Sequence, residues 1–115
     1  MSNPLVTNIR RMNGTVIIDI EGDLTGTSEN TLMDAYAQAS DGDTSKILLN
    51  FSKLDYLNSS GIGLLVTMLI RTQRQKQTLM ACGLSDHYVE IFKLTRLDEA
   101  ISIFDDEDTA LAGNQ

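Results

Sequence analysis

Residues 46–70 read KILLNFSKLDYLNSSGIGLLVTMLI, and this stretch gives the clearest indication of the fold. It opens with the continuous apolar run Ile47-Leu48-Leu49, which is typical of a strand covered on both faces. We therefore predict a strand over Lys46–Phe51. The polar segment 58–61 then precedes a helix that we expect to start near Ser60 and to end near Lys76. A strand followed by such a helix indicates a layered α/β arrangement.

The predicted helix has apolar residues at helical spacing. Its main stripe is expected to be Ile62, Leu65, Val66, Leu69 and Ile70. Leu64 and Met68 fall outside that stripe, so we expect this helix to offer apolar surface to a partner. Arg71, Arg74 and Lys76 lie at its C-terminal end, where positive charge complements the helix dipole.

Upstream of this stretch, the sequence predicts a hairpin and a helix. The strands are expected at Leu5–Arg11 and Thr15–Glu21, because Asn13-Gly14 is a strong hairpin turn signal. An ordered loop is expected over Gly22–Gly26. The helix that follows is predicted from the apolar spacing of its residues, with Thr27 or Ser28 as its cap and Asp41-Gly42-Asp43 as its end. Its apolar stripe is Leu32, Ala35, Tyr36 and Ala39.

Downstream, strands and helices continue to alternate. A strand is predicted at Thr78–Gly83, and a helix capped by Ser85 is expected to reach about Thr95 with Val89 and Phe92 facing inward. Ala100–Phe104 is a last short strand or the start of a helix. The acidic run Asp105–Asp108 is either solvated surface or the start of a short helix; we favour solvated surface over a weak cation site.

The order of elements predicts one domain over residues 1–115. Alternating strands and helices require crossover connections, so the sheet should be mixed and mostly parallel. We expect an α/β fold with four to five strands and three to four helices. The hairpin at the start would add an antiparallel edge.

Composition excludes several function classes. The chain has 115 residues with 9 basic and 16 acidic side chains, for a net charge of -7, so no basic footprint for nucleic acid or an anionic membrane is visible. Its longest mostly apolar stretch, Ile62–Ile70, is shorter than the about 20 residues of a membrane span. No signal peptide is evident, and one cysteine excludes an internal disulfide. We expect a soluble cytoplasmic protein.

The sequence also lacks a recognisable catalytic set. His87 is the only histidine and is expected to be an exposed helix residue, while Cys82 lies in a predicted core strand and should be a small buried side chain. No phosphate loop or dinucleotide fingerprint is present. We therefore predict no enzymatic activity, no cofactor and no metal; a nucleotide-binding or hydrolytic domain is the least favoured class.

The segment Asn58-Ser59-Ser60-Gly61-Ile62-Gly63 stands out. It can be interpreted as a helix cap, with Asn58 or Ser59 accepting hydrogen bonds from the first turn. However, two glycines in that turn cost roughly 1 kcal/mol each relative to alanine. A serine at a helix N-terminus is also well placed for phosphorylation, because free N–H groups and the dipole favour an anion there.

The stretch Leu54-Asp55-Tyr56-Leu57-Asn58-Ser59-Ser60-Gly61-Ile62-Gly63-Leu64-Leu65 resembles the signature of the bacterial anti-sigma factor antagonists, which are single STAS domains. The usual form of that motif is Asp-Ser-Ser-Gly-Leu-Gly or Asp-Ser-Thr-Gly-Leu-Gly. Gly22-Asp23-Leu24-Thr25 is similar to the family's Gly-Glu-Leu-Asp turn. The strand at 46–51 and the ending Ile101–Phe104 also resemble the family, so the likeness covers nearly the whole chain and implies the STAS fold.

The resemblance implies a partner switch. In this family an anti-sigma factor that is also an ATP-dependent serine kinase binds the unmodified antagonist, phosphorylates it and releases it, and a serine phosphatase restores it. By position the acceptor is Ser60, with Ser59 as the alternative. The ATP and magnesium would belong to the kinase. The implied partner-binding residues are Asp23, Thr25, Asn58, Ser59, Ser60, Gly61 and Leu64.

Two positions depart from the family pattern. Asn58 stands where the family commonly has Asp, and Thr25 stands where the turn usually carries Asp. Both changes remove negative charge near the expected acceptor. They leave open a second hypothesis, in which the chain is a STAS interaction module of a larger signalling or lipid-transport assembly and undergoes no phosphorylation.

Overall fold

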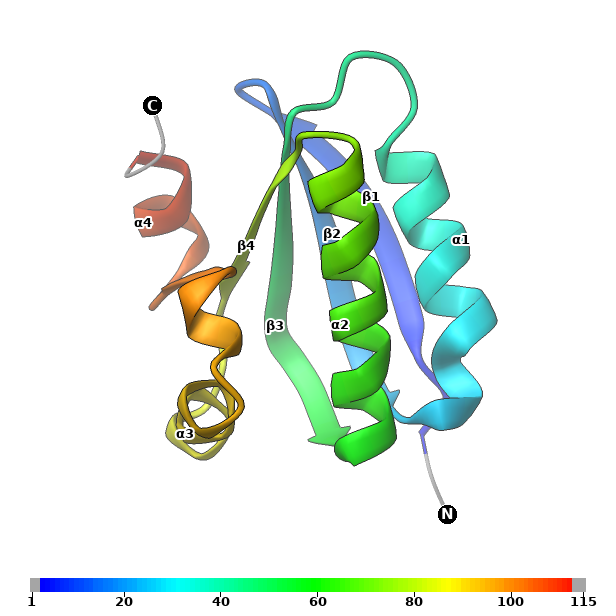
Figure 1. Ribbon diagram of the computed structural model, residues 1–115, viewed down its shortest axis with the longest axis vertical. Coiled ribbons are helices and arrows are strands. Elements are labelled where there is room, and N and C mark those ends of the chain that lie inside the picture. The colour runs from blue at the N-terminus through cyan, green and yellow to red at the C-terminus, as the bar shows by residue number, and fades with distance from the viewer. Residues whose placement is uncertain (1–2, 113–115) are drawn as a thin grey trace.

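The computed structural model describes residues 3–112 and contains one mixed sheet (Figure 1). The strands lie in the order β1-β2-β3-β4-β5. Strands β1 and β2 are antiparallel, whereas β2-β3, β3-β4 and β4-β5 are parallel. The predicted hairpin edge on a mostly parallel sheet is therefore confirmed. The strands are β1 (Val6–Met12), β2 (Thr15–Leu24), β3 (Lys46–Leu57), β4 (Thr78–Cys82) and β5 (Ser102–Phe104).

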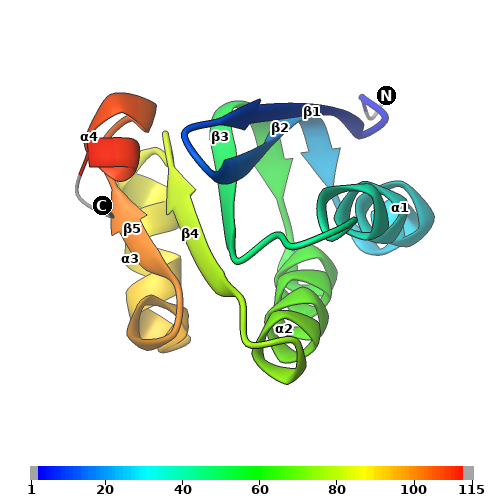
Figure 2. The ribbon, with the colours of Figure 1, turned by 90° about the horizontal axis from the view of Figure 1, so that it is seen from above.

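The helices cover the two faces of the sheet unequally. Figure 2 shows α1, α2 and α3 on one face and the short helix α4 on the other. This arrangement follows from the sequential strand order, because crossovers of one hand return each helix to the same face. The helices are α1 (Glu29–Ala39), α2 (Ser59–Arg74), α3 (Asp86–Leu94) and α4 (Glu107–Ala112), with single 3-10 turns η1 (Gly26–Ser28) and η2 (Leu97–Glu99).

The central strand β3 is buried on both faces, as its apolar run predicted. Ile47, Leu49 and Phe51 belong to the main core beneath α1–α3, while Leu48 belongs to a smaller apolar cluster on the opposite face. Successive strand residues point to opposite faces, so a continuous apolar run serves both. Phe92 and Cys82 are buried and His87 is exposed, as predicted, while Val89 is only half-buried.

The predicted apolar stripe of α2 was right in part. Leu65 is buried, and Ile62 and Leu69 are half-buried against the main core, as expected. The buried residues of this helix are Gly61, Leu65, Met68 and Thr72. Val66 and Ile70 are 38% and 45% exposed, although we expected them to face the core. Met68, expected outside the stripe, is fully buried. The reason is the tight packing of Gly61 on Leu24, described below, which turns this side of the helix toward the sheet.

The strands β2 and β3 extend further than their local patterns predicted. The expected loop over Gly22–Gly26 begins only after Leu24, because Gly22 pairs with Leu54 and Leu24 pairs with Leu57. Gly22 has φ +93°, a conformation that suits glycine, and the pairing shifts register beside it.

Two expected helix caps make different contacts. Ser28 and Ser85 occupy the N-cap positions of α1 and α3, but neither side chain makes a capping hydrogen bond, so the predictions of side-chain capping were wrong. The Ser28 hydroxyl instead accepts from the Thr25 N–H and donates to the Asp23 carbonyl, both at 3.0 Å. It fixes the turn that leads out of β2.

The acidic run near the C-terminus is not simply solvated surface. Glu107 begins α4 and pairs with Arg10 on β1. The prediction of solvated surface was therefore wrong for Glu107, because a cation 97 positions away in sequence lies beside it. Asp105, Asp106 and Asp108 are exposed.

Candidate functional site

The N-terminus of α2 follows directly on the end of β3 (Figure 1). Asn58 is the N-cap, in extended conformation, and its Oδ1 accepts a hydrogen bond of 2.9 Å from the Gly61 N–H. The Asn58 N–H donates to the Leu24 carbonyl at 3.4 Å. Asn58 therefore links the ends of β2 and β3 to the first turn of α2, and the cap interpretation of Asn58 is confirmed.

Ser59 and Ser60 are both exposed in the first turn of α2. Helix N-termini leave their first N–H groups without intrahelical partners, so both hydroxyls lie where an anion is favoured. Ser60 also lies against the turn after β2. A Cβ added to Gly26 would lie 3.2 Å from the Ser60 Cβ and within 4 Å of no other residue beyond its neighbours. The turn at Gly26 therefore packs closely against one side of Ser60.

The two glycines of the motif have different environments. Gly61 is buried, and a Cβ there would lie 2.2 Å from the Leu24 carbonyl oxygen and 2.8 Å from Leu57 Cδ1. Gly63 is exposed, and a Cβ there would meet nothing within 4 Å. Gly61 is thus required by the packing of α2 on the sheet. Gly63 has no such requirement inside the described part of the molecule.

Asp23 and Thr25, the other expected partner contacts, lie at the end of β2 and in the turn beyond it. The Asp23 carboxylate accepts from the Asn3 N–H at 3.0 Å, and the Thr25 and Thr27 hydroxyls lie 3.0 Å apart. This turn reaches the helix start through the contact between Gly26 and Ser60. Leu64 is half-buried and packs against the main core, so only part of its side chain faces outward.

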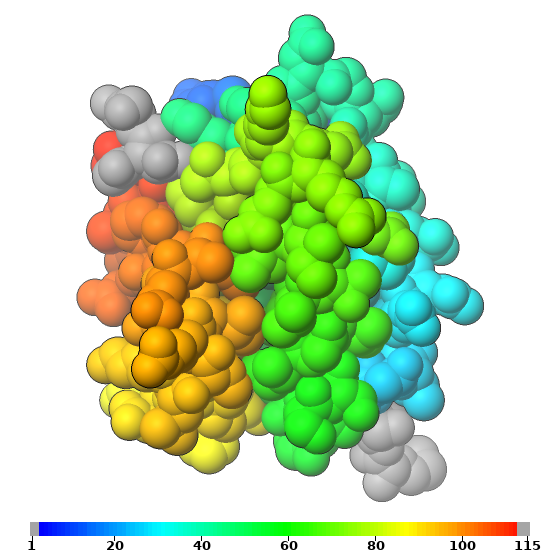
Figure 3. All heavy atoms as spheres, viewed as in Figure 1, coloured from blue at the N-terminus to red at the C-terminus, as the bar shows by residue number. Residues whose placement is uncertain are grey.

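Helix α3 adds residues that the sequence did not assign to this site. The Tyr88 hydroxyl accepts a 3.0 Å hydrogen bond from the Leu57 N–H, which holds the end of β3 just before Asn58. Ile91 and Thr95 line one side of an apolar hollow of about 250 Å³ beside Ser59, and Leu57 and Ile62 line the other. Figure 3 shows α2 along the front of the molecule, with α3 and the residues after it to its left. Ile91 lies outside the expected inward pair of that helix, and its sequence gives no separate signal for this role.

Within residues 3–112, no group of three or more His, Cys, Asp or Glu side chains is arranged to hold a metal ion. No helix in that range is long and apolar enough to cross a membrane.

Comparison with known proteins assigns the fold. The STAS domain family matches residues 7–110. An anti-sigma factor antagonist from Mycobacterium paratuberculosis superposes with a TM-score of 0.83 at 16% identity, covering 98% of this chain and 97% of that one. The phosphorylated form of the Bacillus cell fate determinant SpoIIAA gives 0.72 at 19%, covering 96% and 100%. A sulfate transporter family protein from Wolinella succinogenes gives 0.77 at 19%, covering 90% and 87%.

The family match spans almost the whole described chain, and the solved structure from Mycobacterium paratuberculosis shares the fold over nearly its full length. The STAS fold predicted from the motif is thus confirmed. This chain belongs to the STAS domain family.

Proposed function

We propose that this chain is an anti-sigma factor antagonist that works by partner switching. In its unmodified form it binds an anti-sigma factor that is also a serine kinase. Phosphorylation of Ser60 releases it, and a serine phosphatase returns it to the binding form. ATP and magnesium belong to the kinase, the site of action is the cytoplasm, and the effect on transcription passes through the protein partner without direct contact with nucleic acid.

The observation that carries this proposal is the environment of the first turn of α2. Ser59 and Ser60 are exposed, and position 63 is a glycine although a Cβ there would meet nothing within 4 Å in the described molecule. A glycine in a helix costs about 1 kcal/mol relative to alanine. A partner that packs closely on this turn would need a residue without a side chain at position 63. The likeness to solved anti-sigma factor antagonists also supports binding of an anti-sigma factor.

A phosphate on Ser60 would change this surface sharply while leaving the fold intact. It adds about -1.5 to -2 charges and three acceptor oxygens at a helix end whose dipole favours an anion. Ser60 is exposed, so the phosphate needs no repacking of the core. In a contact that passes close to Gly63, however, the added bulk and charge oppose binding through repulsion and desolvation.

Phosphorylation is tested with the purified protein, ATP-magnesium and a kinase-type anti-sigma factor from the same genome. The intact mass should rise by one phosphate, and peptide mapping should assign it to Ser60. Ser60→Ala should abolish the gain, whereas the matched control Ser59→Ala should keep it. An unchanged mass with a kinase that is active on another antagonist would contradict the phosphorylation step.

Binding is tested separately with Ser60→Ala and Ser60→Asp. We expect Ser60→Ala to bind the anti-sigma factor as tightly as the unmodified protein and to stay bound in the presence of ATP. Ser60→Asp should bind at least about tenfold more weakly, which is about 1.4 kcal/mol. Equal affinities of the two variants would argue against an electrostatic release mechanism.

A second candidate function is a permanent interaction module of a larger signalling or lipid-transport assembly. It is favoured by the outward-facing apolar residues Val66 and Ile70 of α2, and the likeness to a sulfate transporter family protein is compatible with it. In this case Val66→Ser with Ile70→Ser should detach the chain from its assembly, measured by co-purification from the native cell. The partner-switching proposal expects the Ser60 variants to alter partner capture instead.

A further inference from the structure

Helix α4 is attached to the sheet through a small contact. It has six residues, of which Ala110 is buried and Leu111 half-buried. Beneath it lies the smaller apolar cluster, formed by the strand residues Ile17, Leu48, Met80 and Cys82. A helix of this length is not stable alone in water. The helical structure of α4 therefore depends on its attachment to this face.

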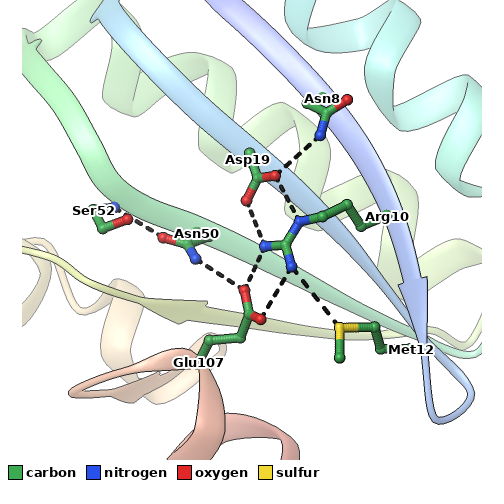
Figure 4. Close-up of polar contacts among 7 residues, drawn as sticks. All are labelled: Asn8, Arg10, Met12, Asp19, Asn50, Ser52 and Glu107. Atoms are coloured by element: carbon green, nitrogen blue, oxygen red, sulfur yellow. Dashed lines mark hydrogen bonds and ion pairs between the residues drawn. The ribbon is translucent and has the colours of Figure 1, made fainter.

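A polar network provides much of that attachment (Figure 4). The Arg10 guanidinium donates to both oxygens of Asp19 at 2.7 Å, and it also donates to both oxygens of Glu107. The Asn50 side-chain amide donates to Glu107 Oε1 at 3.0 Å. We call Arg10, Asp19, Asn50 and Glu107 the Arg10 network.

The Arg10 network is divided unequally between the sheet and α4. Arg10, Asp19 and Asn50 lie on β1, β2 and β3, and only Glu107 comes from the helix. If α4 moved away, Arg10 would keep its two hydrogen bonds to Asp19. Arg10 and Glu107 side chains are also 34% and 22% exposed, so water can replace the bonds between them. Detachment of α4 thus leaves no buried cation unpaired.

We propose that α4 opens away from the sheet as a separate unit, while the strands and α1–α3 stay folded, and that Glu107 controls how often it opens. The open form uncovers Cys82 and the apolar residues around it. This device lies on the face opposite α2 and its two serines, and it is independent of the function proposed above (Figure 2). Parts of a protein that are held by few contacts commonly open at a lower free energy than the whole fold.

Cys82 provides a direct reporter of this motion. It is the only cysteine in the chain, it is 1% exposed, and it packs in the cluster that α4 covers. Burial, with a smaller contribution from the Glu107 carboxylate, raises the pKa of its thiol to about 11. In the closed form the thiol is therefore both shielded and protonated, and reaction with a thiol reagent requires opening.

The experiment measures the rate at which 4,4′-dithiodipyridine modifies Cys82 in the folded protein. Glu107→Gln removes the charge that pairs with Arg10, and we expect it to raise this rate by about tenfold, the lower end for a charge-assisted hydrogen bond. Asp108→Asn is the matched control. It removes one carboxylate charge from the adjacent, exposed position of α4, and should change the rate by less than about twofold.

Urea separates opening of α4 from unfolding of the whole chain. Opening of one short helix exposes little surface, so the wild-type rate should be nearly independent of urea well below the unfolding transition. The proposal is overturned if the wild-type rate rises with the full urea dependence of global unfolding, or if Glu107→Gln and Asp108→Asn react at equal rates. The wild-type urea series decides the question even where Glu107→Gln fails to fold.

Discussion

At the scale of single residues, Gly61 and Gly63 of the same motif have different structural environments. Gly61 lets α2 contact the Leu24 carbonyl, whereas Gly63 meets nothing within the described molecule. One glycine therefore serves the fold and the other is available for a partner. Substitution by alanine separates these roles, because the same change is made two positions apart on one helix.

We predict that Gly61→Ala and Gly63→Ala change stability in opposite directions. A Cβ at Gly61 overlaps backbone, so Gly61→Ala should lower the free energy of unfolding by about 2–3 kcal/mol. Gly63→Ala should raise it by about 0.5–1 kcal/mol through helix propensity. Urea unfolding measures both, and a destabilised Gly63→Ala would contradict the assignment.

The same Gly63→Ala protein should bind the anti-sigma factor more weakly than wild type, since the added methyl group lies on the outward side of the first turns of α2. Isothermal titration with the partner measures this. A variant that is more stable and yet binds less well would locate the contact at Gly63. Unchanged affinity would mean that Gly63 does not contact the partner, and the main observation behind the proposed function would be lost.

Asn58 determines how α2 begins, through its hydrogen bond from the Gly61 N–H. We predict that Asn58→Ala lowers the free energy of unfolding by about 1 kcal/mol, the usual cost of losing an N-cap. Asn58→Asp is the control, because aspartate accepts the same hydrogen bond and should keep stability within about 0.5 kcal/mol of wild type. Chemical denaturation of the three proteins checks this, and equal stabilities of all three would contradict the capping role.

At the scale of elements, the Arg10 network joins β1, β2, β3 and α4. Hydrogen bonds from Arg10 hold the pKa values of both Asp19 and Glu107 below their ordinary ranges, with further contributions from Asn8 and Lys53 at Asp19 and from Asn50 at Glu107. The Asp19 charge opposes part of the effect at Glu107, and Arg10 remains protonated throughout. Ionisation of Asp19 and Glu107 thus stabilises the folded state.

We predict that this network contributes an acid-sensitive part of stability. In the unfolded chain the two carboxyls have pKa values near 3.9 and 4.3, and in the folded chain both pKa values are lower. At a pH between the folded and the unfolded pKa of each carboxyl, the unfolded state therefore binds more protons. The contribution is complete above about pH 5 and is lost as pH falls through the folded pKa values. Arg10→Gln should flatten the acid side of a plot of urea midpoint against pH.

Arg11→Gln is the control for that experiment. It removes a neighbouring, exposed arginine whose side chain makes one described hydrogen bond, to the Gln38 carbonyl. We expect it to keep the acid dependence of wild type. If Arg10→Gln and Arg11→Gln show the same acid dependence, the ion pairs of the network do not cause it.

At the scale of the whole molecule, one main core unites the sheet with α1, α2 and α3. Among the described residues, Phe92 is the largest fully buried side chain and brings α3 into this core. Its ring lies nearly perpendicular to that of Phe51, with the ring centroids 6.3 Å apart. Helix α3 also supplies Tyr88, which holds the end of β3 just before the first turn of α2. Loss of this packing should therefore affect both stability and the site.

We predict that Phe92→Ala lowers the free energy of unfolding by about 3–5 kcal/mol, because it leaves a cavity in the main core. Leu94→Ala lies two residues away on the same helix, where Leu94 is 76% exposed, and should change stability by less than about 0.5 kcal/mol. Thermal and urea unfolding compare the two. A small effect of Phe92→Ala would mean that α3 is not part of the cooperative fold.

Local sequence patterns were sufficient to predict the order of the elements, the hairpin at Asn13-Gly14, the doubly buried strand around Leu48, and a helix that starts within the segment 58–60. These features depend on near neighbours: turn chemistry, alternation along a strand, and the capping group of one helix.

The side of α2 that faces the sheet depends on tertiary packing, because several faces of that helix are apolar and the close packing of Gly61 on Leu24 selects one of them. The pairing of Glu107 with Arg10 and the hydrogen bond from the Leu57 N–H to Tyr88 also depend on tertiary structure. Such contacts join residues far apart in the chain, so no local pattern encodes them. They form only when the sheet brings β1, β3, α3 and α4 together.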